Sequence, residues 1–320
     1  MKKLSALALK AAISLALLSI TIAQVDLGIL GDRLARIDAG WLAASFIVLM
    51  LQAYFVSMRW QVIAVRCEVP LSVWASFRFT LISVLFNQAL PSTMGGDAAR
   101  IWLLVRDGAN LARSTYSVVI DRAVGVLFLA LLVLVCLPWS FELIQNPAGR
   151  AALLLIGIGC FAGPMAFAAL GMRRWPLLER WAVTRHVADA ARFASRLFRE
   201  AYSAVSVIVL SVGVHLLTIT SAWMAAVGVG VPLPFSYALL LVLPVLMISM
   251  IPISIAGWGL REGAMVMAFA YAGLPESDGL LVSVLLGLLM FAVGIAGGIV
   301  WLIGSKGAPR EVPEESGQTP

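Results

Sequence analysis

Residues 87–100 read NQALPSTMGGDAAR, a polar stretch rich in helix breakers within a very apolar chain. Pro91, Gly95 and Gly96 oppose a continuous membrane helix, because proline lacks a backbone donor and glycine is costly to order. Polar side chains at membrane depth are tolerated only where they face protein or a wet cavity. The stretch therefore predicts a break in a helix within the membrane.

A second stretch, residues 252–261, reads PISIAGWGLR and repeats this pattern. Pro252 and Arg261 are nine residues apart, as are Pro91 and Arg100, and a glycine follows each proline at the same offset. The recurrence predicts two related halves. The alternative is chance, since proline and glycine are both frequent in membrane helices.

The composition indicates an all-α polytopic membrane protein. Of the 320 residues, 61% are hydrophobic and only 12% are charged, whereas soluble domains carry about 25% charged residues. The longest polar region, 172–203, is too short for a soluble catalytic domain. We attribute the net charge of +6 to arginine-rich loops on one side of the bilayer, and not to nucleic-acid binding. The three cysteines and two histidines are too sparse for a disulfide framework or metal cluster, so we expect no metal and no cofactor.

Six apolar windows are long enough to span a bilayer, which takes about twenty residues: 4–25, 41–65, 114–137, 150–171, 205–229 and 279–304. Two further apolar regions, 73–106 and 235–272, are each broken centrally by the paired motifs. We interpret each as a re-entrant helical hairpin. We expect one integral membrane domain, 1–304, with halves of about 1–137 and 150–304, followed by a disordered cytoplasmic tail, 305–320.

The distribution of lysine and arginine predicts the topology, because these residues accumulate in cytoplasmic loops. With a cytoplasmic N-terminus and two hairpins that return to their side of origin, the seven arginines within 173–199 fall inside. The two halves are then inverted copies, an arrangement typical of transporters whose broken helices meet at the substrate site. We expect a bacterial inner-membrane protein with both termini in the cytoplasm.

Residues 172–203, between the halves, predict a basic amphipathic helix on the inner membrane surface, where arginines favour anionic headgroups. A plain cytoplasmic linker is the alternative. The apolar face of the predicted amphipathic helix contains Leu178, Trp181, Val187, Ala191, Ala194, Leu197 and Phe198.

Charged residues within membrane segments are the candidates for function. Arg122 or Arg261 would grip a phosphate through forked hydrogen bonds, and the adjacent Asp121 or Glu262 would neutralise it in the empty site. The alternative is that these four residues pair with one another and hold the halves together. The remaining candidates lie at the breaks, as side chains or as backbone donors to an anion: Asn87, Ser92, Gly95, Gly96, Asp97, Arg100, Gly257 and Trp258.

Motifs of soluble catalysis are missing from the sequence. It has no G-x-S-x-G elbow, no H-E-x-x-H helix and no P-loop, so we expect a non-enzyme. An intramembrane transferase that uses Asp97 or Glu262 as a base stays open as an alternative.

Three ordered motifs resemble a known family. They are N-x-x-L-P-S-x-x-G-G-D-x-x-R from Asn87, D-R-x-x-G from Asp121, and P-I-S-x-x-G-x-G-x-R-E-G from Pro252. Together they resemble the membrane domain of lysylphosphatidylglycerol synthases and its stand-alone flippase-like relatives. The resemblance covers about 4–304 and includes no soluble synthase domain.

The resemblance implies translocation of a phosphate-containing or aminoacylated lipid between bilayer leaflets. Stand-alone relatives are associated with glycolipid, polyprenyl-lipid or hopanoid pathways. The alternative function is therefore a non-transporting accessory subunit, partnered by a lipid-modifying glycosyltransferase or synthase.

Overall fold

A computed structural model describes residues 37–89, 94–144, 146–173, 175, 181–250 and 257–304, together with Ser19 and Arg33. The predicted helix at 4–25 and the predicted tail at 305–320 lie outside these residues. Every element in the described ranges is a helix, as the composition predicted. In chain order they are α3 (Ala39–Arg66), α4 (Val73–Ala89), α5 (Gly95–Arg106), α6 (Leu111–Leu143), α7 (Pro147–Leu170), α8 (Ala182–Arg199), α9 (Ala201–Gly228), α10 (Phe235–Ser249), α11 (Leu260–Tyr271) and α12 (Glu276–Gly304).

Five of these helices, α3, α6, α7, α9 and α12, are long and apolar enough to cross a membrane. They coincide with the last five predicted windows. Side chains fix where three of them begin: Asp38, Asn110 and Asn146 each accept hydrogen bonds from two backbone N–H groups of the first turn. This capping satisfies donors that have no partner inside the helix.

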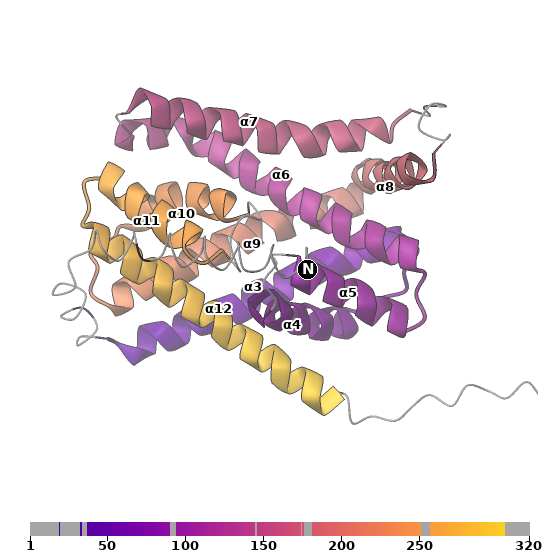
Figure 1. Ribbon diagram of the computed structural model, residues 1–320, viewed down its shortest axis with the longest axis horizontal. Coiled ribbons are helices and arrows are strands. Elements are labelled where there is room, and N and C mark those ends of the chain that lie inside the picture. Colours follow the sequence, from indigo (N-terminus) through magenta and orange to yellow (C-terminus); the bar gives the residue numbers. More distant parts are fainter. Residues whose placement is uncertain are drawn as a thin grey trace, which may run out of the picture.

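Both broken regions form helical hairpins, as predicted. The first consists of α4 and α5, and the second of α10 and α11. The hairpins lie toward opposite ends of the bundle, with α4 and α5 where α6 begins and α10 and α11 where α6 ends (Figure 1). Each hairpin therefore enters the bundle from its own end.

The segments α3–α6 and α9–α12 share the order helix, hairpin, helix, and they pack as counterparts. The helix α3 lies against its counterpart α9, while the first hairpin packs on α12 and the second on α6. Hydroxyl pairing joins the first interface, since the Oγ atoms of the buried Ser45 and Ser221 are 2.7 Å apart. Small and hydroxylated residues allow such close contact between membrane helices. The fold is an all-helical polytopic membrane protein built from two inverted helix–hairpin–helix units.

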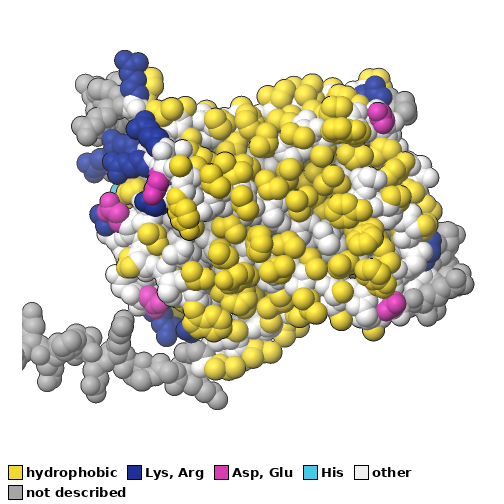
Figure 2. Space-filling view, turned by 180° about the vertical axis from the view of Figure 1, so that it is seen from behind, with side chains coloured by type: hydrophobic (Ala, Val, Ile, Leu, Met, Phe, Trp, Pro, Cys, Tyr) yellow, Lys and Arg dark blue, Asp and Glu magenta, His cyan; other side chains and the backbone are white. Residues whose placement is uncertain are grey.

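Charge is concentrated at the ends of the bundle. Apolar side chains cover the middle of the surface, and lysines and arginines gather mainly at one end (Figure 2). Two ion pairs lie near the loops of that end, Arg66–Glu200 at 2.5 Å and Arg113–Glu68 at 2.7 Å. This separation is the one expected of a bundle whose middle faces hydrocarbon.

The amphipathic helix α8 differs in part from its prediction. Three members of the predicted apolar face, Ala191, Ala194 and Leu197, are buried, and α8 packs against α6, α7 and α9. Its contact with α7 is tight, because a Cβ on Gly171 would lie 2.0 Å from the Ala191 carbonyl oxygen. Trp181 and Val187 are exposed instead. The small residues of α8 thus dock on the bundle, and only part of its apolar face is left for lipid.

Candidate functional site

A cavity of about 370 Å³ lies where the tips of the two hairpins converge. The first hairpin contributes Val84, Asn87 and Gln88 from the end of α4 and Asp97 and Arg100 from the start of α5, while the second contributes Leu246, Ser249 and Met250 from the end of α10. The helices α3, α6, α9 and α12 supply the remaining walls: Leu49, Gln52, Ala53, Val56, Arg59, Asp121, Arg122, Gly125, Leu129, Val214, His215, Thr218, Met290 and Val293.

The cavity lies deep within the bundle. Arg59 is seven residues before the end of α3, a distance of about 10 Å along a helix. Asp121 is ten residues after the start of α6, or about 15 Å. These depths are far enough from either helix end for the polar groups to require partners within the protein.

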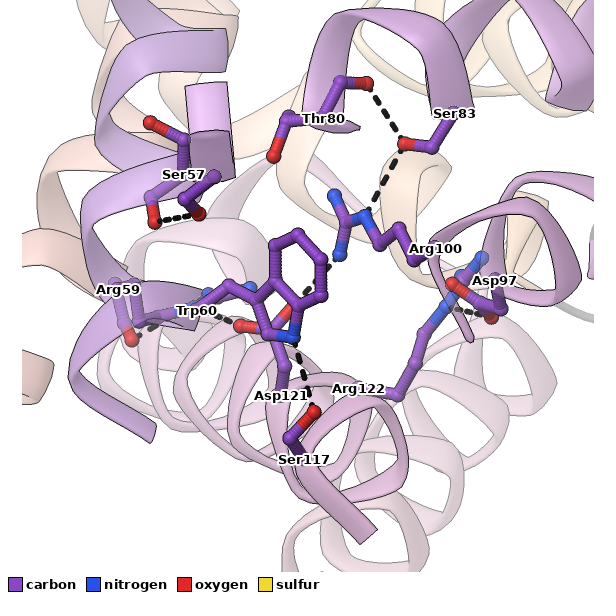
Figure 3. A network of polar contacts seen from close by, with 12 residues as sticks. Ser57, Arg59, Trp60, Thr80, Ser83, Asp97, Arg100, Ser117, Asp121 and Arg122 are labelled. Carbon is purple, nitrogen blue, oxygen red and sulfur yellow. Dashed lines mark hydrogen bonds and ion pairs between the residues drawn. The ribbon is translucent and has the colours of Figure 1, made fainter. Parts of the chain in front are cut away.

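Asp121 joins two buried arginines at one wall of the cavity (Figure 3). One carboxylate oxygen accepts from Arg59 Nε at 2.8 Å, and the other accepts from Arg100 Nη1 at 3.1 Å. Arg100 also donates its Nε to Ser83 Oγ at 3.1 Å, and its guanidinium lies 4.9 Å from the centre of the Trp60 ring. The buried arrangement holds two positive charges on a single carboxylate.

The neighbouring ion pair, Asp97–Arg122, is much more accessible. Arg122 Nε lies 2.6 Å from Asp97 Oδ2, and the Arg122 side chain is 43% exposed whereas Arg100 is 9% exposed. Adjacent residues on a helix point about 100° apart, so Asp121 and Arg122 reach different partners. Because its side chain is exposed at the cavity wall, the Arg122 guanidinium can exchange the Asp97 carboxylate for an anionic ligand.

The tip of the first hairpin is closed by its own polar groups. The backbone N–H of Gly96 donates to Asn87 Oδ1 at 2.8 Å, so this predicted anion donor is already occupied. A Cβ at Gly96 would lie 2.3 Å from the Ser83 carbonyl oxygen. Gly95, at the start of α5, is also buried. Ser92 lies outside the described residues.

The second motif forms a separate polar cluster. Arg261 Nη2 and Glu262 Oε1 are 2.6 Å apart and both side chains are buried. Arg261 Nε donates to Ser283 Oγ at 3.1 Å, and its guanidinium lies 5.0 Å from the Trp258 ring centre.

The second cluster lies apart from the cavity that contains Arg122. Arg261, Glu262, Gly257 and Trp258 do not line the cavity as formed by the described residues. Gly257 has a φ of +83° in the turn that precedes α11. The N–H of Gly259 donates to Glu262 Oε2 at 2.6 Å, so this donor too is occupied.

The ion pairs of Asp97, Asp121 and Glu262 each lie within one half, whereas the Arg33–Asp278 pair, at 3.2 Å, joins the two halves. Asp121 and Asp97 bind arginines of α3–α6, and Glu262 binds Arg261 of α11. Of the four residues in this interpretation, Arg261 and Glu262 pair with each other, while Asp121 pairs with Arg59 and Arg100 of its own half. Weaker polar contacts do cross, including Arg59 Nη1 with Ser211 Oγ at 3.4 Å and His215 Nε2 with the Gly125 carbonyl oxygen at 3.1 Å.

Arg59 was not among the candidate residues drawn from the sequence. The available signal was its position six residues before the end of the predicted window at 41–65, about two helical turns deeper than Arg66. His215 was not among these candidates either, and it lines the cavity.

Comparison with family models places the chain among known membrane domains. Residues 7–298 match the model described as the lysylphosphatidylglycerol synthase TM region. The chain belongs to the lysylphosphatidylglycerol synthase transmembrane-region family. No curated protein and no solved structure matched the chain.

Membership of the lysylphosphatidylglycerol synthase transmembrane-region family confirms the resemblance drawn from the three motifs. It makes the chain a multi-pass membrane protein related to lipid modification or flipping. The family motifs also coincide with the polar clusters: Asn87, Asp97, Arg100 and the Asp121-Arg122 pair all line the cavity.

Proposed function

We propose that this protein moves a lipid with a phosphate-containing headgroup between the leaflets of a bacterial inner membrane. The observation that carries the proposal is the accessible Asp97–Arg122 pair in a cavity at the meeting point of two inverted hairpins. Arg122 engages the phosphate, while the acyl or prenyl tails stay in the surrounding lipid.

The size and depth of the cavity support this proposal. A volume of about 370 Å³ lies toward the lower end of the range of about 300–1,000 Å³ for small-molecule sites. It suits a headgroup better than a whole lipid with its tails. In transporters built from inverted repeats, substrate sites lie near the midplane where broken helices meet, and rocking of the halves then alternates access.

A reconstitution experiment tests this function. Proteoliposomes containing fluorescent phosphatidylglycerol are treated with membrane-impermeant dithionite, and the initial rate at which inner-leaflet lipid becomes accessible is compared with that of protein-free liposomes. We expect faster exchange with the protein, and an unchanged rate would overturn the proposal.

Two neighbouring positions on α3 provide a steric test of the cavity. Gln52 lines the cavity, whereas Leu51 is 44% exposed on the apolar surface. We expect Gln52→Trp to slow translocation at least tenfold, because the indole fills the headgroup volume, and Leu51→Trp to leave it unchanged. Equal rates for the two variants would show that lipid crosses elsewhere.

The same preparation discriminates the alternative functions. A non-transporting accessory subunit predicts no exchange above protein-free liposomes. An intramembrane transferase predicts a chemically modified lipid, which mass spectrometry of the extracted liposomes would reveal.

A further inference from the structure

The cavity extends deeper into the bundle than its cluster of arginines. On α3 the lining residues run from Arg59 back to Leu49, and on α6 they run from Asp121 on to Leu129. Along a helix these stretches span about 15 Å and about 12 Å. Arg122 lies at the shallow end, because the preceding Asp121 binds Arg59 at 2.8 Å. A phosphate held by Arg122 therefore leaves the deeper part of the cavity for another portion of the headgroup.

A glutamine lines the deeper part of the cavity. Gln52 lies at the middle of α3, about 20 Å along the helix from either end. An amide at this depth in a membrane is costly unless it faces protein or a wet cavity. Gln52 lines the cavity and is half-buried. Its side chain therefore brings a hydrogen-bond acceptor and two N–H donors to the deeper part of the cavity.

Thr218 of α9 lines the cavity at the same depth as Gln52. The two helices run antiparallel, and their register is set by the Ser45–Ser221 hydroxyl pair at 2.7 Å and by a contact of Arg59 with α9 at 3.4 Å. Gln52 and Thr218 both lie between these two contacts. The Thr218 hydroxyl donates to a backbone carbonyl of its own helix at 2.9 Å, and its oxygen can still accept a hydrogen bond. Two helices thus present uncharged hydrogen-bonding groups at one level of the cavity.

Charged and uncharged groups are therefore separated along the cavity. Gln52 lies seven residues before Arg59, which places it on the same face of α3 and about 10 Å deeper. A headgroup whose phosphate binds Arg122 and whose far end carries hydroxyl groups satisfies both levels, whereas an apolar end would leave the amide without a hydrogen bond from the ligand. We propose, building on the function proposed above, that Gln52 and Thr218 bind headgroup hydroxyls, so that the protein selects phosphodiester lipids that carry a glycerol or a sugar.

A pair of lipids that differ only in hydroxyl groups tests this selectivity. Phosphatidylglycerol and phosphatidylpropanol carry the same negative charge and a headgroup of the same length, but only the first has free headgroup hydroxyls. Each competes, unlabelled, with phosphatidylglycerol that carries a fluorescent acyl chain for the purified protein in nanodiscs of phosphatidylcholine. We expect phosphatidylglycerol to compete at least tenfold better, because burying polar groups without hydrogen bonds is costly. Equal competition by the two lipids would overturn the proposal.

Substitutions at the two positions test whether the preference arises at this level of the cavity. Gln52→Met removes the amide but keeps an unbranched side chain of similar length, and it should reduce the preference for phosphatidylglycerol to less than threefold. Thr218→Val removes the hydroxyl and should reduce the preference at least twofold. Gln61→Met is the matched control, because the Gln61 amide lies on the same helix but donates to the Leu71 carbonyl oxygen at 3.1 Å, outside the described cavity. We expect this control to keep the preference within twofold of wild type.

The variants decide the proposal in either direction. A folded Gln52→Met that keeps the wild-type preference would overturn it, and so would an equal loss of preference in Gln61→Met. If Gln52→Met does not fold, Thr218→Val decides, and an unchanged preference in that variant would overturn the proposal.

Two further outcomes separate this inference from the proposed function. Glycerophosphoglycerol has the same headgroup chemistry without acyl chains, and competition as strong as that of phosphatidylglycerol would contradict a lipid as the ligand. Hydroxyl-selective lipid binding without translocation would contradict the proposed function and leave this inference standing, whereas translocation without hydroxyl preference would do the reverse.

Discussion

Arg100 and Arg261, each nine residues after a proline of its hairpin break, are held in matching surroundings in the two halves. Each donates Nε to a serine hydroxyl at 3.1 Å, and each lies about 5 Å from a tryptophan ring centre, 4.9 Å for Trp60 and 5.0 Å for Trp258. Each also binds a buried carboxylate. The carboxylate differs in origin, because Asp121 comes from the following helix and Glu262 from the next residue along the chain.

The matching surroundings predict similar structural roles for the two arginines. Arg261→Gln leaves the buried Glu262 short of its arginine, and removing one partner of a buried pair typically costs about 3–5 kcal/mol. Arg100→Gln leaves Asp121 paired with Arg59 but removes the bond to Ser83 and the contact with Trp60, so it should cost less. We expect both variants to unfold at clearly lower temperatures in detergent than wild type. Arg113→Gln, which breaks an ion pair that is about half exposed, should change the free energy of unfolding by less than about 1 kcal/mol and serves as the control. Equal stability of all three variants would contradict this role.

The first hairpin should tolerate no side chain at Gly96. A Cβ there would lie 2.3 Å from the Ser83 carbonyl oxygen and 2.7 Å from the Asn87 side chain. Gly96→Ala should therefore force α4 and α5 apart and lower both the melting temperature and the translocation rate. Gly159→Ala is the matched control, since its Cβ would meet nothing within 4 Å and alanine favours a helix by up to about 1 kcal/mol. A neutral Gly96→Ala would contradict the packing of the hairpin tip.

Close contact between the halves depends on Gly297 of α12. A Cβ at this position would lie 2.0 Å from the carbonyl oxygen of Leu81 on α4. We expect Gly297→Ala to reduce the amount of folded protein, measured by size-exclusion chromatography. The backbone of α4 cannot move aside as the end of a flexible side chain can. Gly163→Ala on α7, whose Cβ would meet nothing within 4 Å, should behave as wild type. Equal amounts of folded protein for the two variants would contradict this close contact between α12 and α4.

Cys67, directly after α3, should resist thiol reagents. Burial, with a smaller contribution from Glu68, raises the pKa of its thiol to about 12, so the reactive thiolate is scarce until the pH approaches that value. In a background with Cys136→Ala and Cys160→Ala, maleimide should label Cys67 slowly at pH 8 in the folded protein and rapidly after denaturation in detergent. Rapid labelling of the folded protein at pH 8 would place this residue at an exposed position instead.

The sequence was sufficient to predict the order of the fold but not its pairings. Helix breakers at Pro91 and Pro252, together with hydropathy, predicted two hairpins and the five described spans, because these depend on local composition. The partners of Asp121, Arg122 and Arg261 depend on which helix faces which, and a one-residue step along a helix turns a side chain by about 100°. Their pairing could not be derived from spacing alone.

The candidate site was predicted in part. Of the residues proposed from the sequence, Asn87, Asp97, Arg100, Asp121 and Arg122 line one cavity. The residues of the second motif form their own buried cluster, because Glu262 lies close enough to neutralise Arg261 and cap α11 at once. Arg59 was missed because the predicted end of a membrane helix does not separate a loop arginine from one a turn or two deeper.

Arg122 is the residue on which the account depends, because it is the most exposed of the three cavity arginines. The most direct test is the initial rate of phosphatidylglycerol translocation in dithionite-treated proteoliposomes, measured for wild type and Arg122→Gln at equal amounts of folded protein. Because the Arg122 side chain is 43% exposed, we expect the variant to fold and to translocate at least tenfold more slowly. A stably folded Arg122→Gln that translocates phosphatidylglycerol at the wild-type rate would contradict the account.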